Sequence, residues 1–205
     1  LAEKLNSPNA NVCVHAHIGR EAVIITLPCG EGKGRAGWHA GTGASGGSAN
    51  NTHLSAEMTE PATATIKYVG VSKWIEIGDG SNIKAHVLAT YKNAVEIFAE
   101  WCVLHGLDPL EDGVIISHSE GCKRGIASNH GDVEHLWSKF GLSMEQFRKD
   151  IKAVMEGDNV DFGGGVEVTD TSSQQITPLS GTVTVIYPGE DGLNIRKAPD
   201  YRADV

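Results

Sequence analysis

The sequence lacks any long apolar run, and no stretch approaches the ~18 consecutive apolar residues that a membrane-spanning helix needs. It also lacks an excess of basic residues, because 17 Lys and Arg stand against 26 Asp and Glu, a formal net charge of −9. The first absence excludes an integral membrane protein. The second argues against a general nucleic-acid binder, which needs a basic footprint, although it does not exclude a local basic patch.

Cysteine is scarce, with four in 205 residues and no C-x-x-C pair. A small secreted disulfide scaffold would be denser in cysteine, so we expect reduced thiols, some of them in the core. No G-x-x-x-x-G-K-[ST] loop occurs, which disfavours nucleotide binding. The remaining composition, 40% hydrophobic and 21% charged residues, is that of a globular protein. The length allows one domain and a remainder.

Apolar periodicity predicts strands and helices in alternation. Residues 83–105 carry one apolar stripe at helical spacing before Gly106, and Ser143 opens a second helix, with capping-box spacing, that Gly157 closes. Four segments alternate apolar and polar residues or are short and apolar, and are expected as strands: residues 11–18, 22–27, 52–58 and 114–117. Residues 30–51 and 59–81 are expected as irregular connections. The pattern predicts a mixed α/β domain.

The composition changes after this domain. Residues 157–180 are rich in Gly, Ser, Thr, Asp and Gln, and are expected as a flexible linker. Residues 182–186 (TVTVI) form a β run, and a second strand begins near residue 193. Because two strands do not make a stable domain, residues 181–205 are expected as the start of a small β-domain. The catalytic or binding domain is then 1–156.

One polar cluster stands out after the predicted strand 114–117. His118 follows it directly, and His130, Asp132, Glu134 and His135 come within the next segment. A residue at a strand end is held rigidly, and His with carboxylate ligands describes a catalytic zinc site. A single His there would be read as a turn former or a solvated group. Three His with two acids favour a site, although the spacing is not the H-E-x-x-H helix signature.

Two further groups of residues are candidates for substrate contacts or catalysis. Trp38 and His39 lie in a Gly-rich loop, where the Trp either lines a substrate groove or anchors the loop to the core, and residue types alone do not decide. Glu57, followed by Glu60, is either a general base for a hydrolytic water or a solvated strand acid.

His15 and His17 alternate on the first predicted strand and would therefore share a face. A paired metal site is possible there. The simpler interpretation is two partly buried histidines satisfied by hydrogen bonds.

Five motifs in order resemble a known family: residues 5–9 (LNSPN), 37–41 (GWHAG), 50–57 (NNTHLSAE), 117–121 (SHSEG) and 125–132 (GIASNHGD). Residues 1–155 resemble the type 2 N-acetylmuramoyl-L-alanine amidases of the peptidoglycan-recognition-protein fold, and most closely phage and prophage endolysins of Gram-positive hosts. The tail 181–205 resembles the first strands of a bacterial SH3-like cell-wall-binding domain.

The resemblance implies a zinc hydrolase (cofactor Zn²⁺) that cuts the amide between N-acetylmuramic acid and L-alanine of peptidoglycan. It implies a central mixed sheet flanked by helices. Action would be at the bacterial cell wall or outside the cell, including release from the cytoplasm as a phage endolysin. The matching residues are metal ligands His118 and Asp132, catalytic Glu57 and His130, and substrate contacts Trp38, His39, Asn51 and His15. A competing alignment makes His130 the ligand in place of Asp132.

The resemblance departs from the family at one ligand. The family's first zinc His lies on a strand that precedes the helix ending near Leu5, and no residue of this sequence matches it. We therefore expect little turnover and sub-stoichiometric zinc from this chain, and treat residues 1–156 as an N-terminally truncated domain. Two alternatives are a peptidoglycan-binding module of the same fold without catalysis, and a different zinc hydrolase on another α/β scaffold.

Overall fold

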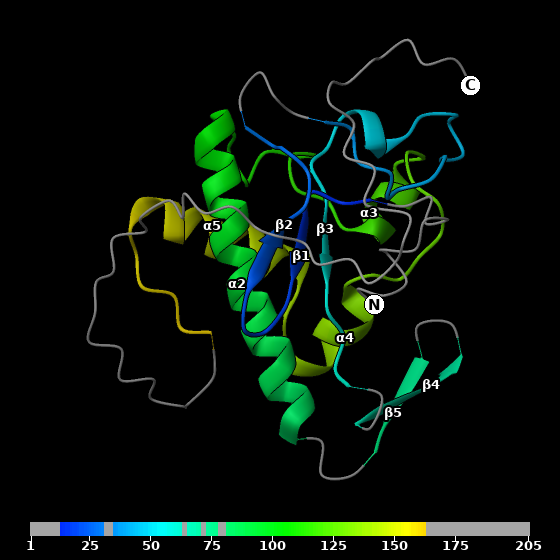
Figure 1. Ribbon diagram of the computed structural model, residues 1–205, viewed down its shortest axis with the longest axis vertical. Helices are drawn as coiled ribbons and strands as arrows, with labels where there is room; N and C mark the ends of the chain where they lie inside the picture. The colour runs from blue at the N-terminus through cyan, green and yellow to red at the C-terminus, as the bar shows by residue number, and fades with distance from the viewer. Residues whose placement is uncertain (1–12, 31–34, 63–64, 71–72, 78–80, 163–205) are drawn as a thin grey trace, which may run out of the picture. The chain divides into compact units, whose positions relative to one another are not determined.

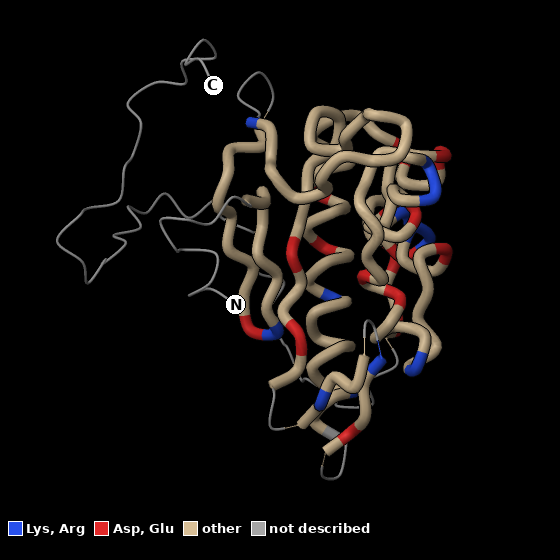
Figure 2. Tube along the Cα trace, turned by 90° about the vertical axis from the view of Figure 1, so that its right-hand side faces the viewer, with Lys and Arg blue, Asp and Glu red and all other residues tan. Residues whose placement is uncertain are grey.

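The computed structural model describes residues 13–30, 35–62, 65–70, 73–77 and 81–162 (Figure 1). Within these ranges the fold is mixed α/β, as expected. The predicted β-domain 181–205 and most of the predicted linker lie outside the described residues. No helix in the described part combines the length and apolar character needed to cross a membrane. Lys and Arg are interspersed with Asp and Glu along the described elements (Figure 2).

Three short strands form the central sheet. Strands β1 (Ala16–Ile18), β2 (Val23–Ile25) and β3 (Ala56–Met58) lie in the order β2-β1-β3, with β1 antiparallel to β2 and parallel to β3. Each lies inside a segment predicted as a strand, but is shorter than predicted. The parallel register pairs His17 with Glu57, so the sheet sets these two side by side on neighbouring strands.

A bulge before β1 interrupts its alternation. The amides of His15 and Ala16 both donate to the carbonyl oxygen of Ser55, at 2.8 and 3.2 Å. Two successive residues opposite one is the pattern of a β-bulge. His15 is fully buried with its ring against Trp101, whereas His17 stays partly exposed. The simple alternation expected for the two histidines therefore does not extend through this point.

Both long helices were predicted correctly. Helix α2 (Ser81–His105) is followed by Gly106 at φ +63°, and α5 (Met144–Glu156) by Gly157 at φ +85°. A positive φ suits glycine, which has no Cβ to clash with the following carbonyl. The Ser143 side chain accepts the Gln146 amide and caps the start of α5, as its spacing indicated.

The predicted strand at residues 114–117 is wrong. The segment runs from a turn, where the Val114 amide donates to the Glu111 carbonyl, to Ser117, the N-cap of helix α3 (His118–Lys123). The carbonyl of Ile115 accepts the Nε–H of Arg148, at 2.9 Å, in place of a strand partner. An apolar run of four residues does not distinguish a strand from a buried connection, and here α5 supplies the hydrogen bond.

The predicted irregular connection 59–81 is also partly wrong, because it contains a hairpin. Strands β4 (Ile66–Gly70) and β5 (Lys73–Glu76) pair antiparallel, with Tyr68 opposite Trp74. The Trp74 indole donates to the backbone carbonyl of His135, at 3.0 Å. That residue belongs to α4 (Glu134–Trp137), a helix of one turn that was not predicted either. The remaining short helices are η1 (Ala49–Asn51) and η2 (Ser138–Phe140).

The core joins α2 to α5. The Tyr91 ring lies 4.9 Å from the Trp137 ring and 5.5 Å from the Phe147 ring, between centroids. Its hydroxyl donates to the Asp150 carboxylate at 2.7 Å, and the Gln146 amide donates to the other carboxylate oxygen at 2.7 Å. Asp150 is only 8% exposed, so these two donors replace most of the water that its charge would otherwise bind.

Replacing Asp150 by Ala is expected to lower the free energy of unfolding by about 1–3 kcal/mol, because it leaves the fully buried Tyr91 hydroxyl without its acceptor. Urea unfolding followed by tryptophan fluorescence measures this change. Lys149→Ala is the control, since Lys149 pairs with Glu145 on the exposed side of the same helix and should cost less than about 0.5 kcal/mol. Equal losses from the two variants would contradict the role of the Tyr91–Asp150 hydrogen bond.

Candidate active site

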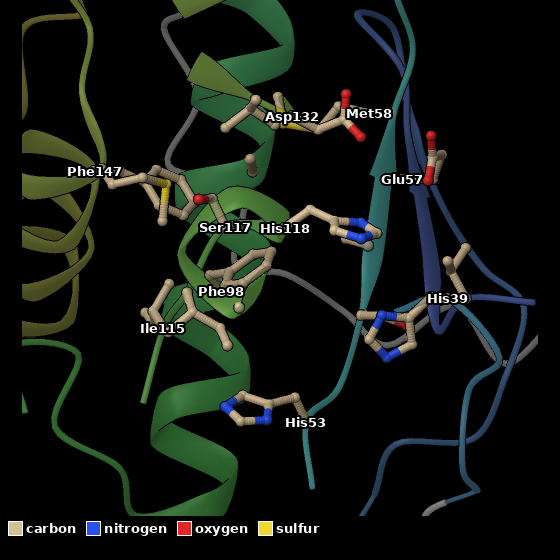
Figure 3. Close-up of a pocket in the computed structure, with 18 of the residues that line it drawn as sticks. His39, His53, Glu57, Met58, Phe98, Ile115, Ser117, His118, Asp132 and Phe147 are labelled. Atoms are coloured by element: carbon tan, nitrogen blue, oxygen red, sulfur yellow. The ribbon is translucent and has the colours of Figure 1, made fainter. Parts of the chain in front are cut away.

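A cavity of about 190 Å³ brings together side chains from four separate segments. His39 comes from the Gly-rich loop, Glu57 from β3, His118 from the start of α3, and Asp132 from the loop before α4. Figure 3 shows these side chains, with His53, around one opening. The cavity's inner end is apolar, lined by residues of β3, α2 and α5 that include Met58, Phe98 and Phe147. A polar mouth over an apolar interior is the usual form of a small-ligand site.

Glu57 has the most perturbed carboxyl group of this cavity. The residue is exposed, but its side chain lines the cavity, where neighbouring protein atoms take away part of the hydration of the carboxyl group. This loss of hydration, followed by the negative charges of Asp132 and Glu60, raises its pKa from 4.5 to about 7. A carboxyl group with a pKa near neutrality is suited to accept a proton in one step and return it in another.

His118 and His130 face each other beside the cavity. Nε2 of His118 lies 3.2 Å from Nδ1 of His130, and the Ser128 hydroxyl lies 3.1 Å from each nitrogen. Burial and the neighbouring His130 lower the pKa of His118. His118 is held in place because Ser117 and Glu120 form a capping box at the start of α3.

His39 presents a buried ring nitrogen to the cavity. Its Nε2 is buried and has no hydrogen-bond partner among the described residues. Burial, and then the nearby His15, His118 and His53 rings, lower its pKa to about 4, so the ring is neutral at physiological pH. A buried polar atom without a partner points to a ligand or an ordered water that supplies one.

His135 connects the cavity wall to the β4–β5 hairpin. Its Nε2 lies 3.1 Å from the Tyr68 hydroxyl and 3.3 Å from the Glu60 carboxylate, and its Nδ1 lies 3.7 Å from Asp132. The hydrogen bond with Glu60 raises the pKa of His135 and lowers that of Glu60. Through His135, the hairpin therefore helps to hold Glu60 and Asp132, the two carboxylates whose negative charges raise the pKa of Glu57.

Three predicted substrate contacts lie outside this cavity. The Trp38 side chain is 60% exposed and does not line it, and Asn51 lines a neighbouring cavity of about 670 Å³ beside Trp101. His15 is fully buried, with one ring nitrogen 3.1 Å from the Ser55 hydroxyl and the other 2.6 Å from the Arg35 carbonyl. In this arrangement His15 holds the loop that carries His39 and does not line the cavity.

The described residues do not by themselves fit a catalytic zinc ion. No group of three or more His, Cys, Asp or Glu side chains among them is placed to hold one metal. The His118 and His130 nitrogens have a suitable spacing, since two ligands about 2.0–2.1 Å from a tetrahedral zinc lie roughly 3.3 Å apart. Two ligands are fewer than the three protein ligands of catalytic zinc sites.

Sequence reasoning missed four participants: His53, Tyr68, Ser117 and Ser128. His53, Ser117 and Ser128 lie inside the motifs quoted for the resemblance but were not singled out there, and Tyr68 acts through His135, which is distant in the chain. The spacing within SHSEG, with Ser117 three residues before Glu120, was a capping-box signal that would have located the start of α3.

Comparisons with known proteins found no relative of this chain. No family model matches the chain, and neither the curated proteins nor the solved structures yielded a match. The resemblance to the amidases rests on the motifs quoted above.

Proposed function

We propose that this protein is an N-acetylmuramoyl-L-alanine amidase of the peptidoglycan-recognition-protein fold, a hydrolase that acts on bacterial cell wall. The observation that carries the proposal is the convergence of Glu57, His118, Asp132 and His39 on one cavity from segments up to 93 residues apart (132 − 39). All four belong to motifs that resemble that family. Zinc dependence and the peptidoglycan substrate enter through the resemblance alone.

Residues that line the cavity, with His130 beside it, would carry out the steps of amide hydrolysis. Glu57, in its carboxylate form, takes a proton from the water that attacks the amide carbon, and returns it to the leaving amine. His130 donates to the oxygen of the tetrahedral intermediate from beside His118. The apolar inner end excludes water from the reacting groups, which strengthens these electrostatic interactions.

A second candidate is a peptidoglycan-binding module of the same fold that does not hydrolyse its ligand. One observation favours it: the described residues assemble no group of three metal ligands. The cavity and its polar mouth would then serve recognition only. The two candidates differ in turnover and not in ligand.

Incubating the 205-residue chain with purified peptidoglycan and Zn²⁺ tests the proposal. Amidase activity releases stem peptides with a free N-terminal L-alanine, which N-terminal labelling and mass spectrometry detect. We expect a small amount of this product, because little turnover is expected from this chain, and no new reducing sugar ends. Retention on peptidoglycan without any free L-alanine would favour the binding module, and new reducing ends or another peptide cut would contradict both candidates. Metal analysis of the purified chain checks separately for the expected sub-stoichiometric zinc.

A further inference from the structure

Glu134, the first residue of α4, joins two segments of the candidate site. Its Oε1 atom accepts a hydrogen bond from the hydroxyl of Ser117 and another from the hydroxyl of Ser119, each at 2.7 Å. These two serines flank His118 at the start of α3, and Glu134 itself lies two residues after Asp132. One carboxylate oxygen therefore connects the segment that carries His118 with the segment that carries Asp132.

The two connected helices are otherwise held by different parts of the fold. Arg148 of α5 bonds to Glu120 of α3, whereas the β4–β5 hairpin contacts His135 of α4 through Tyr68. Within the part of the chain that the structure describes, the two bonds to Glu134 are the hydrogen bonds that join α3 and its N-cap to α4. This serine–glutamate bridge therefore sets the place of one helix start relative to the other.

The second carboxylate oxygen of Glu134 is buried and has no hydrogen-bond partner among the described residues. A buried acceptor without a partner costs about 1–3 kcal/mol, so stability alone does not favour a carboxylate in this place. Groups that break such a rule tend to lie at functional sites. Here the bridge ends at residues of the cavity, since Ser117, His118 and Asp132 all line it (Figure 3).

We infer that Glu134 is a positioning residue, whose bridge to the two serines holds the His118 ring in place relative to Asp132. The inference rests on the proposed function, which uses both of these groups and His130. A shift of the start of α3 would also move His118 relative to the His130 ring nitrogen that lies 3.2 Å away. A displacement of about 1 Å can lower a reaction rate about 10²-fold. Glu134 does not line the cavity, and so acts through the residues that it holds.

Three variants separate the bridge from the rest of the residue. Glu134→Ala removes both hydrogen bonds. Glu134→Gln keeps a carbonyl oxygen that can accept from both hydroxyls, and should therefore behave like the wild type. Ser119→Ala removes one of the two bonds and should show the same changes as Glu134→Ala at smaller size. Ser117 is less suitable for substitution, because its hydroxyl also caps α3.

Long-range ¹H–¹⁵N NMR spectra of the imidazole rings test the inference without any need for turnover. The ring signals of His118 and His130, assigned from His118→Gln and His130→Gln, should shift or split in Glu134→Ala and stay in place in Glu134→Gln. Asp150→Ala is the matched control, because it destabilises the fold through the lost Tyr91 hydrogen bond and leaves the bridge intact. It should leave both sets of ring signals unchanged.

Hydrolysis of a muramoyl peptide, N-acetylmuramoyl-L-alanyl-D-isoglutamine, gives the second measurement. We expect Glu134→Ala to lower kcat about tenfold or more and to change KM less than about threefold, because misalignment acts on the transition state more than on ligand binding. Glu134→Gln should keep both constants within about threefold of the wild type.

The outcomes separate the inference from the proposed function. Unchanged ring signals in Glu134→Ala, or equal changes in Glu134→Gln or Asp150→Ala, would overturn the inference whether or not the chain is an amidase. Ring signals that shift while kcat stays at the wild-type value would overturn it as well. Ring signals that shift in Glu134→Ala alone among these three, in a chain that hydrolyses no muramoyl peptide, would support the bridge and remove the amidase activity. Should Glu134→Ala fail to fold, Ser119→Ala decides by the same signals.

Discussion

Replacing Glu57 by Gln is expected to lower the rate of L-alanine amide hydrolysis by about 10²- to 10⁴-fold, the range that general acid–base groups contribute. Gln keeps the size and polarity of the side chain but cannot accept a proton. Position 57 lies on β3 and lines the cavity, and the register of β3 with β1 places it beside His17. The measurement is the rate of release of free L-alanine N-termini, with binding of the muramoyl peptide as the control for an intact site.

The pH profile gives a sharper test of the same residue. A general base must be deprotonated, so the wild-type rate should rise with pH and level off above about 7, the raised pKa of Glu57. Glu60→Gln removes one of the negative charges that raise this pKa, and should move the rise to lower pH. A wild-type rate that is flat between pH 5 and 8, or a Glu57→Gln variant that retains the rise, would remove Glu57 from the base role.

The same shift makes a prediction for stability. Between pH 4.5 and about 7 the folded protein holds the Glu57 proton more tightly than the unfolded chain does, so this group's contribution to the free energy of unfolding falls as pH rises. Glu57→Gln lacks the group, and should therefore gain stability relative to the wild type on going from pH 4 to pH 8. Urea midpoints at the two pH values measure the difference. A gain in the opposite direction would contradict the raised pKa.

Replacing Gly43 by Ala is expected to destabilise the fold by about 3 kcal/mol or more, the largest structural effect that we predict. A Cβ at position 43 would lie 1.9 Å from the carbonyl oxygen and 2.1 Å from the carbonyl carbon of Gly125. These are backbone atoms and cannot move aside as a flexible side chain would. The Gly-rich loop that contains Gly43 and the turn that contains Gly125 would have to separate. This would weaken the backbone hydrogen bonds from Ser45 to Gly125 and from Ala49 to Ile126.

The loss would extend to the candidate site, because the two segments that separate carry parts of it. The loop holds His39, and the turn leads to Ser128 and His130. Thermal or urea unfolding measures the stability, and muramoyl-peptide binding measures the site. Gly30→Ala is the matched control, since a Cβ at Gly30 meets nothing within 4 Å, and it should change stability by less than about 0.5 kcal/mol. Similar stability for the two variants would contradict the close contact at Gly43.

Local signals determined the parts of the fold that depend on neighbours in sequence. The apolar stripe and Gly106 predicted α2, and Ser143 and Gly157 predicted α5, because helix periodicity and capping act within a few residues. The motifs also selected His39, Glu57, His118 and Asp132 as candidates, and the structure places all four on one cavity. What these residues do there, including any zinc chemistry, stays a prediction.

Tertiary structure alone decided the features that depend on distant partners. Arg148 of α5 donates a hydrogen bond to the carbonyl of Ile115, so the apolar run 114–117 forms a connection and not a strand. At the bulge opposite Ser55, the His15 side chain points into the core. The hairpin that carries Tyr68 is held in place by the contact between Tyr68 and His135. The loop that carries His39 is held by hydrogen bonds with Asn50, Cys13 and Ser128, which lie in other parts of the chain. The pattern of apolar residues encodes which side chains are buried. Which polar atoms find partners is set by packing between segments far apart in the chain.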